Sequence, residues 1–483
     1  MIVFAQRALW FSYWCFVAVV ALLAALYLLL RLTFSSLPAY QVELEEHLGG
    51  VLGAEVAIGQ LHTYWRGSNP VLEVHNFQLS GDTALTVEKA VIGLDLARSL
   101  AFQQPIFKQL EVNRPVINVR IPAEDDTAQQ PSPRSLDPAD ATGALWLKLL
   151  LRQQQVQVSQ ASVRVQRVGM PALLLPDINI DLGAGSGLHQ LRILGQLAAD
   201  VDGSEATRVP FTFTAEVDGS PTFNPLNFYF ELPQISRSLF NPWLAHFQLP
   251  EIGALEAELK VWGTYKRRAL EYISVQGGVK VLKVAEQTFE KVNLRSSLQR
   301  GIEGYQAQVE ADLVANGKPY TLPLISADWK QGLGAIPDQL SADSIDLSRL
   351  SAWLDKQPFL PYMAQRAVTM LQPEGHIENL VVRWPQPDWA AFELDADLFN
   401  VEVKPWGGAP GLGPVTGRLR HDIRGGAIDL DNNRFTMHFP DLKMPRWKYT
   451  FARGHVNWAL TDEAVEVGSG LLQLKNKDVT AAG

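Results

Sequence analysis

Residues 63–81 read TYWRGSNPVLEVHNFQLSG, and this stretch decides the fold class. A turn-forming cluster precedes a run in which apolar and polar residues alternate, which is typical of a β-strand with one apolar face. Leu72 and Val74 occupy even-numbered positions, whereas Phe77 and Leu79 occupy odd-numbered ones, so the parity of the apolar positions changes between them. Strict alternation would place the two pairs on opposite faces. A β-bulge would re-aim the side chains at this point, and a sandwich corner is the alternative.

The same alternation recurs along the chain and predicts a mostly β protein. It is found in residues 211–217, 255–261, 305–313 and 392–398, and clusters of Gly, Asn, Asp and Pro separate such segments. These turn residues favour antiparallel meanders over parallel sheets. A second change of parity follows Leu398.

Composition excludes several classes of protein. The 483 residues carry 42 basic and 51 acidic side chains, a net charge of −9, which argues against a general nucleic-acid binder because phosphate binding needs a basic face. The one cysteine, Cys15, excludes intramolecular disulfides and zinc sites built from several thiolates. We expect no nucleic-acid partner and no cofactor.

The N-terminal segment indicates a membrane anchor. Residues 11–30 read FSYWCFVAVVALLAALYLLL, which is twenty residues without a charge and long enough to span a hydrocarbon core of about 30 Å. Interfacial side chains are predicted at Trp10, Tyr13, Trp14 and Arg31. A cleaved signal peptide and a buried core helix are the alternatives, but the run is long for a signal peptide and no clear cleavage site follows.

Composition also suggests an order of segments. We expect a short amphipathic helix after the anchor, helical insertions at 236–250 and 346–371, and β-rich sequence elsewhere. The predicted segments are a cytoplasmic N-terminus and anchor (1–34), a helix and β module (35–122), a polar Pro-rich loop (123–143), a β segment with helical insertions (144–345), a helical insertion (346–375) and a further β segment (376–483).

No motif for catalysis or metal binding stands out. The nine histidines are scattered and none lies in an H-E-x-x-H motif. GAGSG at 183–187 lacks the Lys-Ser/Thr of a phosphate loop and is interpreted as a hairpin tip. DLDNNRFTMHFP at 429–440 begins like an EF-hand, but Arg434 replaces the required glycine and Pro440 the bidentate glutamate. We therefore predict that the protein is not an enzyme.

Two blocks of sequence carry a family resemblance. The first is LGAEVAIGQLHTYWRGSNPVLEVHNFQLSG with the following LTVEKAVIGLDLARSLAFQQPIFKQLEVNRPVINVRI. The second is VKPWGGAPGLGPVTGRLRHDIRGGAIDLDNNRFTMHFPDL followed by ARGHVNWAL. Together with the N-terminal anchor they resemble the YhdP family of the AsmA-like superfamily, whose TamB/AsmA-type members are bridge-like lipid transport proteins. Members of that family run to more than twice this length, so the chain is expected to match their N-terminal portion.

The resemblance implies a fold, a location and a role. The implied fold is an elongated, twisted antiparallel β-sheet groove, shaped like a taco, with a few short helices. The implied location is the bacterial inner membrane, with a single-pass anchor, a cytoplasmic N-terminus and the bulk of the chain in the periplasm. The implied role is phospholipid transport to the outer membrane in support of its permeability barrier. A periplasmic scaffold or assembly factor for outer-membrane proteins is the alternative, so outer-membrane or periplasmic proteins are possible partners beside phospholipid and the inner membrane.

Apolar residues on the alternating strands are the candidates for the groove lining. They are Phe211, Phe213, Leu259, Val261, Ala307, Val309, Leu313, Phe392 and Leu394. The other interpretation is that they fill a closed core.

Overall fold

The chain divides into two units, Met1–Glu251 and Ile252–Gly483, here called unit 1 and unit 2. The computed structural model describes residues 2–52, 54–81, 83–102, 106–121, 155–167, 170–185, 187–199, 208–219, 224–247, 250–266, 269–284, 287–315, 317–330, 332–334, 336–348, 351, 369–389, 391–406, 410–439, 446–460, 465–477 and 480–482. The predicted Pro-rich loop and most of the predicted helical insertion at 346–375 lie outside these residues. The predictions of a mostly β fold with few helices and of an apolar N-terminal helix are confirmed.

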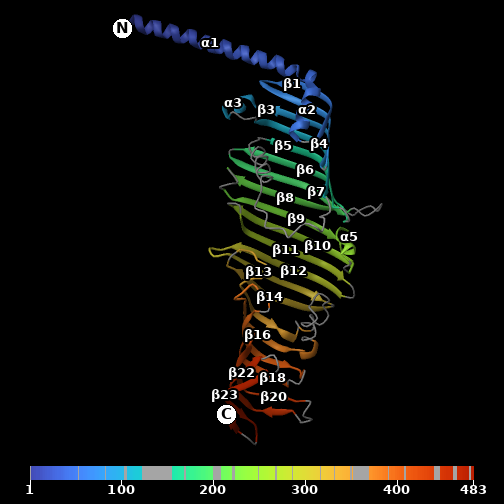
Figure 1. The fold of residues 1–483 in the computed structure, drawn as a ribbon, viewed down its shortest axis with the longest axis vertical. Coiled ribbons are helices and arrows are strands. Elements are labelled where there is room, and N and C mark those ends of the chain that lie inside the picture. The colour runs from blue at the N-terminus through green and yellow to red at the C-terminus, as the bar shows by residue number, and fades with distance from the viewer. Residues whose placement is uncertain are drawn as a thin grey trace. The chain divides into compact units, whose positions relative to one another are not determined.

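Unit 1 contains nine described strands and most of the described helices (Figure 1). The helices are α1 (Ile2–Ser35), η1 (Leu37–Tyr40), α2 (Gln41–Leu52), α3 (Leu96–Phe102), η2 (Arg237–Leu239) and α5 (Asn241–His246). The strands are β1 (Glu55–Arg66), β2 (Asn69–Ser80), β3 (Thr83–Leu94), β4 (Phe107–Ile121), β5 (Gln155–Arg167), β6 (Leu173–Gly185), β7 (Leu188–Ala199), β8 (Val209–Asp218) and β9 (Leu226–Ser236). Each strand pairs with the next in sequence, antiparallel except for the parallel pair β4–β5.

Unit 2 contains the remaining described strands. They are β10 (Ile252–Lys266), β11 (Ala269–Val284), β12 (Gln287–Arg300), β13 (Tyr305–Ala315), β14 (Lys318–Trp329), β15 (Gln339–Asp346), β16 (Glu374–Arg383), β17 (Glu393–Val403), β18 (Gly411–Asp422), β19 (Gly425–Asn432), β20 (Phe435–His438), β21 (Trp447–Tyr449), β22 (Phe451–Leu460), β23 (Val465–Lys475) and β24 (Thr480–Ala482). Strands β10–β19 form an antiparallel meander that continues through β22, β23 and β24. The hairpin β20–β21 branches from the start of β18.

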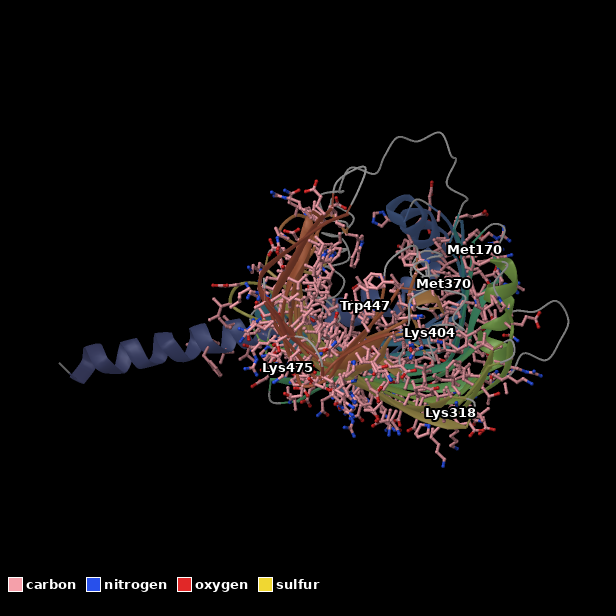
Figure 2. The ribbon with its side chains drawn as sticks, turned by 90° about the horizontal axis from the view of Figure 1, so that it is seen from below. Met170, Lys318, Met370, Lys404, Trp447 and Lys475 are labelled. Carbon is pink, nitrogen blue, oxygen red and sulfur yellow. The ribbon has the colours of Figure 1, made fainter. Side chains whose placement is uncertain are left out.

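The sheet of each unit has an apolar face and a polar face because the side chains alternate along its strands. In β8 the apolar face carries Val209, Phe211, Ala215 and Val217, all buried, and intervening residues such as Glu216 are exposed. In unit 2 the apolar face includes the buried cluster Leu398, Val401, Val415, Leu430, Phe435 and Ala452. Figure 2 shows side chains on both faces, with Trp447 on the concave side of the unit 2 sheet.

The parity change in β2 coincides with a left-handed backbone residue, Asn76, at φ 54°. The register with β1 is undisturbed, because Ile58 pairs with Phe77 and Gln60 with His75 on either side of it. Val74 is buried in a cluster against which Leu72, Phe77 and Leu79 also pack, so the side chains before and after the change of parity lie on one face. With Asn76 in the left-handed conformation, two consecutive residues, His75 and Asn76, lie between Val74 and Phe77 where strict alternation would place one. The apolar face therefore stays continuous.

Left-handed residues recur at the matching place in neighbouring strands of unit 1, and we call this row the crease. Its positive-φ members are Asn76, Arg114, Gln160 and Asp177. The registers place Arg114 directly beside Gln160, and Arg114 Nε donates to Gln160 Oε1 at 3.0 Å. Arg114 Nη1 also lies 3.0 Å from Glu88 Oε2 on β3. The crease therefore runs across the strands, and its polar side chains bond along it.

The helix α2 covers the first strand (Figure 1). Because β1 pairs on one side only within unit 1, the outer edge of its backbone needs other partners. Glu45 Oε1 accepts a hydrogen bond from the Ile58 amide at 2.8 Å, and Gln41 Nε2 donates to the Ile58 carbonyl at 2.6 Å. Leu44 and Leu48 of the same helix pack on the apolar cluster. The amphipathic helix expected after the anchor therefore closes both an edge and a face.

Candidate functional site

The two predicted lining residues of unit 1 lie on the apolar face of β8. Phe213 pairs with Phe230 of β9, and its ring stacks against Phe228 at a centroid distance of 6.4 Å. The Phe211 ring lies 6.2 Å from that of Phe230. A Cβ on Gly195 would come within 2.7 Å of the Phe211 ring, so the glycine makes room for the aromatic side chain. These rings form a tightly packed patch.

The predicted residues of β10 and β13 share the apolar face of unit 2 and are half-buried. Leu259 and Val261 face Gly277 and Val275 of β11. On β13 the residues concerned are Ala307, Val309 and Leu313, whose partners on β14 are Ala327, Ile325 and Tyr320.

The last two predicted residues lie at one end of β17. Leu394 pairs with Val382 on one side and with His421 on the other. Phe392 directly precedes the strand, and its ring lies 5.9 Å from that of His421. Both side chains are half-buried. The apolar face thus extends to the ends of the strands.

The apolar faces differ in how far they are covered. In unit 1, α2 covers β1 and β2, and Leu239 of η2 is 8% exposed where η2 contacts β7. In unit 2, most of the apolar side chains of β10 to β14 keep part of their surface accessible. Within the described residues, this part of the apolar face is therefore not fully covered.

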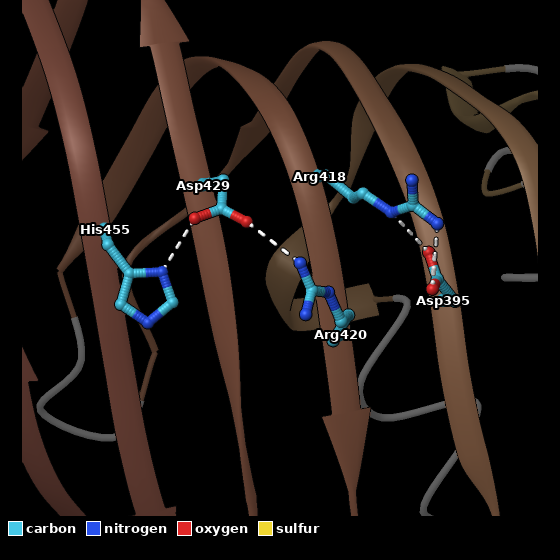
Figure 3. Close-up of polar contacts among 5 residues, drawn as sticks. All are labelled: Asp395, Arg418, Arg420, Asp429 and His455. Carbon is cyan, nitrogen blue, oxygen red and sulfur yellow. Dashed lines mark hydrogen bonds and ion pairs between the residues drawn. The ribbon is translucent and has the colours of Figure 1, made fainter.

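The polar face of unit 2 is held by charged side chains across neighbouring strands (Figure 3). Arg418 bonds to both carboxylate oxygens of Asp395, at 3.0 and 3.1 Å, and Arg420 lies 3.2 Å from Asp429. The His455 ring bonds to Asp429 at 2.7 Å, and this hydrogen bond lowers the pKa of Asp429. The hydrogen bond to Asp395 raises the pKa of Arg418. All these contacts are exposed, so this face is a water-facing surface.

A second polar cluster lies on the polar face of unit 1. Lys89 Nζ is 2.6 Å from Glu73 Oε1, and His75 Nε2 is 2.8 Å from the same oxygen. The hydrogen bond from Lys89 is the largest cause of the lowered pKa of Glu73, and burial opposes it. His62 lies beside His75, with ring centroids 5.8 Å apart. These contacts link β1, β2 and β3 on the side away from the apolar cluster.

The described residues show no arrangement that suggests catalysis. Among them, no group of three or more His, Cys, Asp or Glu side chains could hold a metal ion. A hollow of about 280 Å³ is lined by Glu258, Lys260, Arg295, Glu310 and Asp312 and lies on the polar face of unit 2. Its Arg295–Glu310 ion pair is exposed. The hollow contains opposite charges that pair across strands.

The apolar helix α1 ends against the first strand. One helix of the described chain is long and apolar enough to span a membrane, over Phe16–Ser35, somewhat later than the span expected from sequence. The Trp65 ring packs edge-on against Tyr27 and Phe34, at 5.5 and 5.8 Å, and Arg31 lies over its face at 5.8 Å. Trp14 is 53% exposed. The side chains of Trp10 and Tyr13 lie outside the described set.

A comparison with family models gives one finding. The model of the YhdP protein family matches residues 1–483. The chain belongs to the YhdP family. The comparisons with curated proteins and with solved structures give no match. The family suggested by the two sequence blocks is therefore confirmed.

Sequence reasoning missed three features of this YhdP-family chain. It did not predict the contact between Trp65 and the anchor helix, because Trp65 is far from the apolar span in the sequence. It did not predict that Gln41 and Glu45 would bond to the backbone of β1. It identified the parity change in β2 but not its repetition in β4, β5 and β6, where Arg114, Gln160 and Asp177 carry no glycine signature.

Proposed function

We propose that this chain is an inner-membrane-anchored periplasmic lipid conduit, which carries phospholipid towards the outer membrane and supports its permeability barrier. Membership of the YhdP family, which suggests the AsmA-like lipid transport proteins and is not a known enzyme family, supports the proposal. The observation that carries it is the continuous apolar face of each unit, backed by a charged polar face and only partly covered.

The energetics of lipid transfer explain why such a face is useful. A phospholipid has on the order of 30 methylenes, and moving them from a membrane into water costs roughly 20 kcal/mol or more at about 0.8 kcal/mol each. An apolar surface that runs across many strands removes most of this cost at every position. It needs no reactive group, because the acyl chains require only apolar contact and the head groups stay in water.

The helix α1 supplies the anchor in this proposal. Its apolar window has a mean hydropathy of 2.4 and contacts β1 through Trp65, so lipid leaving the membrane would meet the first strands directly. The proposed topology has a cytoplasmic N-terminus and a periplasmic remainder. Alkaline phosphatase fused after residue 60 should be active in cells, and an inactive fusion would contradict this topology.

Photo-crosslinking at neighbouring positions tests the conduit. A benzophenone amino acid at Leu259 or Val309, on the apolar face, should capture phospholipid in growing cells. The matched controls are Glu258 and Glu310, one residue away on the polar face. Equal capture at both sets, or capture at the glutamates alone, would refute the proposal. Protein adducts in place of lipid would favour the alternative, a scaffold for outer-membrane proteins.

A further inference from the structure

The apolar faces carry a few polar atoms that have no partner. In the described part of the chain, the buried side-chain nitrogens without a hydrogen bond are Trp65 Nε1, His189 Nδ1, Trp384 Nε1 and His421 Nδ1. By register, Trp65, His189 and His421 belong to the apolar face, and Trp384 continues the alternation of Val382 just after the end of β16. Among the described residues, one side-chain oxygen, Gln196 Oε1, is also buried without a partner, and it lies on the polar face. Buried donors without acceptors are unfavourable, so each of these positions needs an explanation.

In unit 1 the two unpaired nitrogens lie at the same end of the sheet. Trp65 is the second-last residue of β1, and His189 is the second residue of β7. Five antiparallel pairings and one parallel pairing separate the two strands, so β7 runs opposite to β1. The end of β1 and the beginning of β7 therefore share one rim. Arg31 lies 5.8 Å from the Trp65 ring and adds a cation there.

In unit 2 the other two nitrogens also share a rim. Trp384 directly follows β16, and His421 is the second-last residue of β18. Both strands pair antiparallel with β17, so they run in the same direction and end on the same side. Phe392 and Trp458 lie on either side of His421, each at a ring distance of 5.9 Å. A row of aromatic rings, two of which carry buried unpaired nitrogens, thus borders the apolar face.

We propose that these rims bind the hydrogen-bond acceptor oxygens of glycerophospholipids at the boundary between head group and acyl chains. The indole Nε1 is only a donor, and a neutral imidazole can donate from Nδ1, so a rotation of the buried ring at either rim would turn an N–H group towards an ester carbonyl or a phosphate oxygen. Aromatic side chains with a polar end favour the same boundary in membranes. This inference rests on the proposed function and adds the orientation of the lipid: the acyl chains run along the strands, away from the rim.

The orientation can be measured with two diazirine lipids. The full chain is reconstituted through α1 into phosphatidylethanolamine vesicles that contain a probe with the diazirine near the ester or at the end of the acyl chain. Peptide mapping should place the first probe near 384–394 and 419–426 and the second near 398–403. Reversed or indistinguishable maps would overturn the proposed binding at the rim. An absence of adducts with both probes would overturn the proposed conduit function itself.

Substitutions at the rim test the role of the donors. Trp384→Phe combined with His421→Phe keeps the rings and removes both nitrogens, and retention of diacyl phosphatidylethanolamine should fall about fivefold for each donor lost. His421→Gln restores an N–H and should restore part of the retention. Trp389→Phe changes a neighbouring exposed indole and should have no effect. Unchanged retention in the double variant would overturn the proposal.

An ether-linked dialkyl analogue distinguishes the two acceptors. It keeps the phosphate and lacks the ester carbonyls. If the double variant retains less of both lipids, by the same factor, the acceptor is the phosphate. If its retention falls for the diacyl lipid alone, the acceptor is the ester carbonyl. Both outcomes support binding at the boundary between head group and acyl chains.

Discussion

Strands β1 to β6 and strands β7 to β9 of unit 1 present an apolar face in two different ways. In β2, β4, β5 and β6, a left-handed residue changes the parity part-way along the strand, whereas β7, β8 and the paired part of β9 (226–231) alternate without interruption, and these three strands contain no described positive-φ residue. The creased strands gain an extra outward position, and polar groups such as Arg114 and Gln160 bond along it. Strands β8 and β9 instead carry paired phenylalanine rings on this face, one pair tilted and one stacked.

The comparison shows that regular alternation is not required for a continuous apolar face. A change of parity is tolerated when neighbouring strands make it at the same place, because the register between them is then preserved. The straight strands depend on side-chain packing, and the creased strands depend on backbone conformation. The two regions should therefore respond to different substitutions.

The largest effect is expected in the straight strands. Phe211→Ala removes a side chain that is 9% exposed and should lower the local free energy of unfolding by about 3–5 kcal/mol. Hydrogen exchange of the β7–β9 amides measures it. Thr212→Ala, a neighbour on the other face, is the control and should cost little. An equal loss of protection in both variants would mean that packing on the apolar face does not determine the stability of these strands.

A smaller effect is expected at the crease. Asn76→Val places a β-branched side chain at φ 54° and should cost about 1–3 kcal/mol, whereas Asn76→Gly should be close to neutral because glycine adopts this conformation readily. Protection of the β1–β3 amides against exchange reports the difference. If valine were tolerated as well as glycine, the left-handed conformation would not be what holds the crease.

The edge contact of α2 should have a still smaller effect. Glu45→Ala leaves the Ile58 amide without its acceptor and should cost about 1 kcal/mol, seen as faster exchange of that amide and of α2. Glu46→Ala removes the same charge from an exposed site on the same helix and serves as the control. Identical exchange in the two variants would show that the contact does not stabilise the edge.

The smallest effect is expected on the polar face. Asp429 has a lowered pKa, so its contribution to stability is present above its ordinary pKa of 3.8 and is lost as the pH falls through the lowered value. The pair with His455 is exposed and should contribute about 0.5 kcal/mol or less. A double-mutant cycle with Asp429→Asn and His455→Gln at pH 6 measures it. A coupling energy several times larger would show that this contact is more than a surface pair.

Much of the fold could be predicted from the sequence because alternation is a local property. The apolar parity of Phe211, Leu259 and Leu394 was evident from two or three neighbours on each side, and the registers place all three on the apolar face. Their role in lining a lipid groove remains a prediction. The parallel pair β4–β5 was not predicted, because alternation shows which side chains share a face and not whether neighbouring strands run parallel or antiparallel.

Local sequence patterns are enough to predict the class of structure: an apolar N-terminal helix and many strands that separate apolar from polar residues with a period of two. The face on which Phe77 and Leu79 lie depends on the folded backbone, because one left-handed residue at Asn76 reverses the parity of the residues that follow it in β2. Strand pairing likewise places Trp384 and His421 at one rim, since β16 and β18 end on the same side of the sheet only because both pair with β17. Periodicity is local, whereas register and strand direction arise from pairing between distant segments.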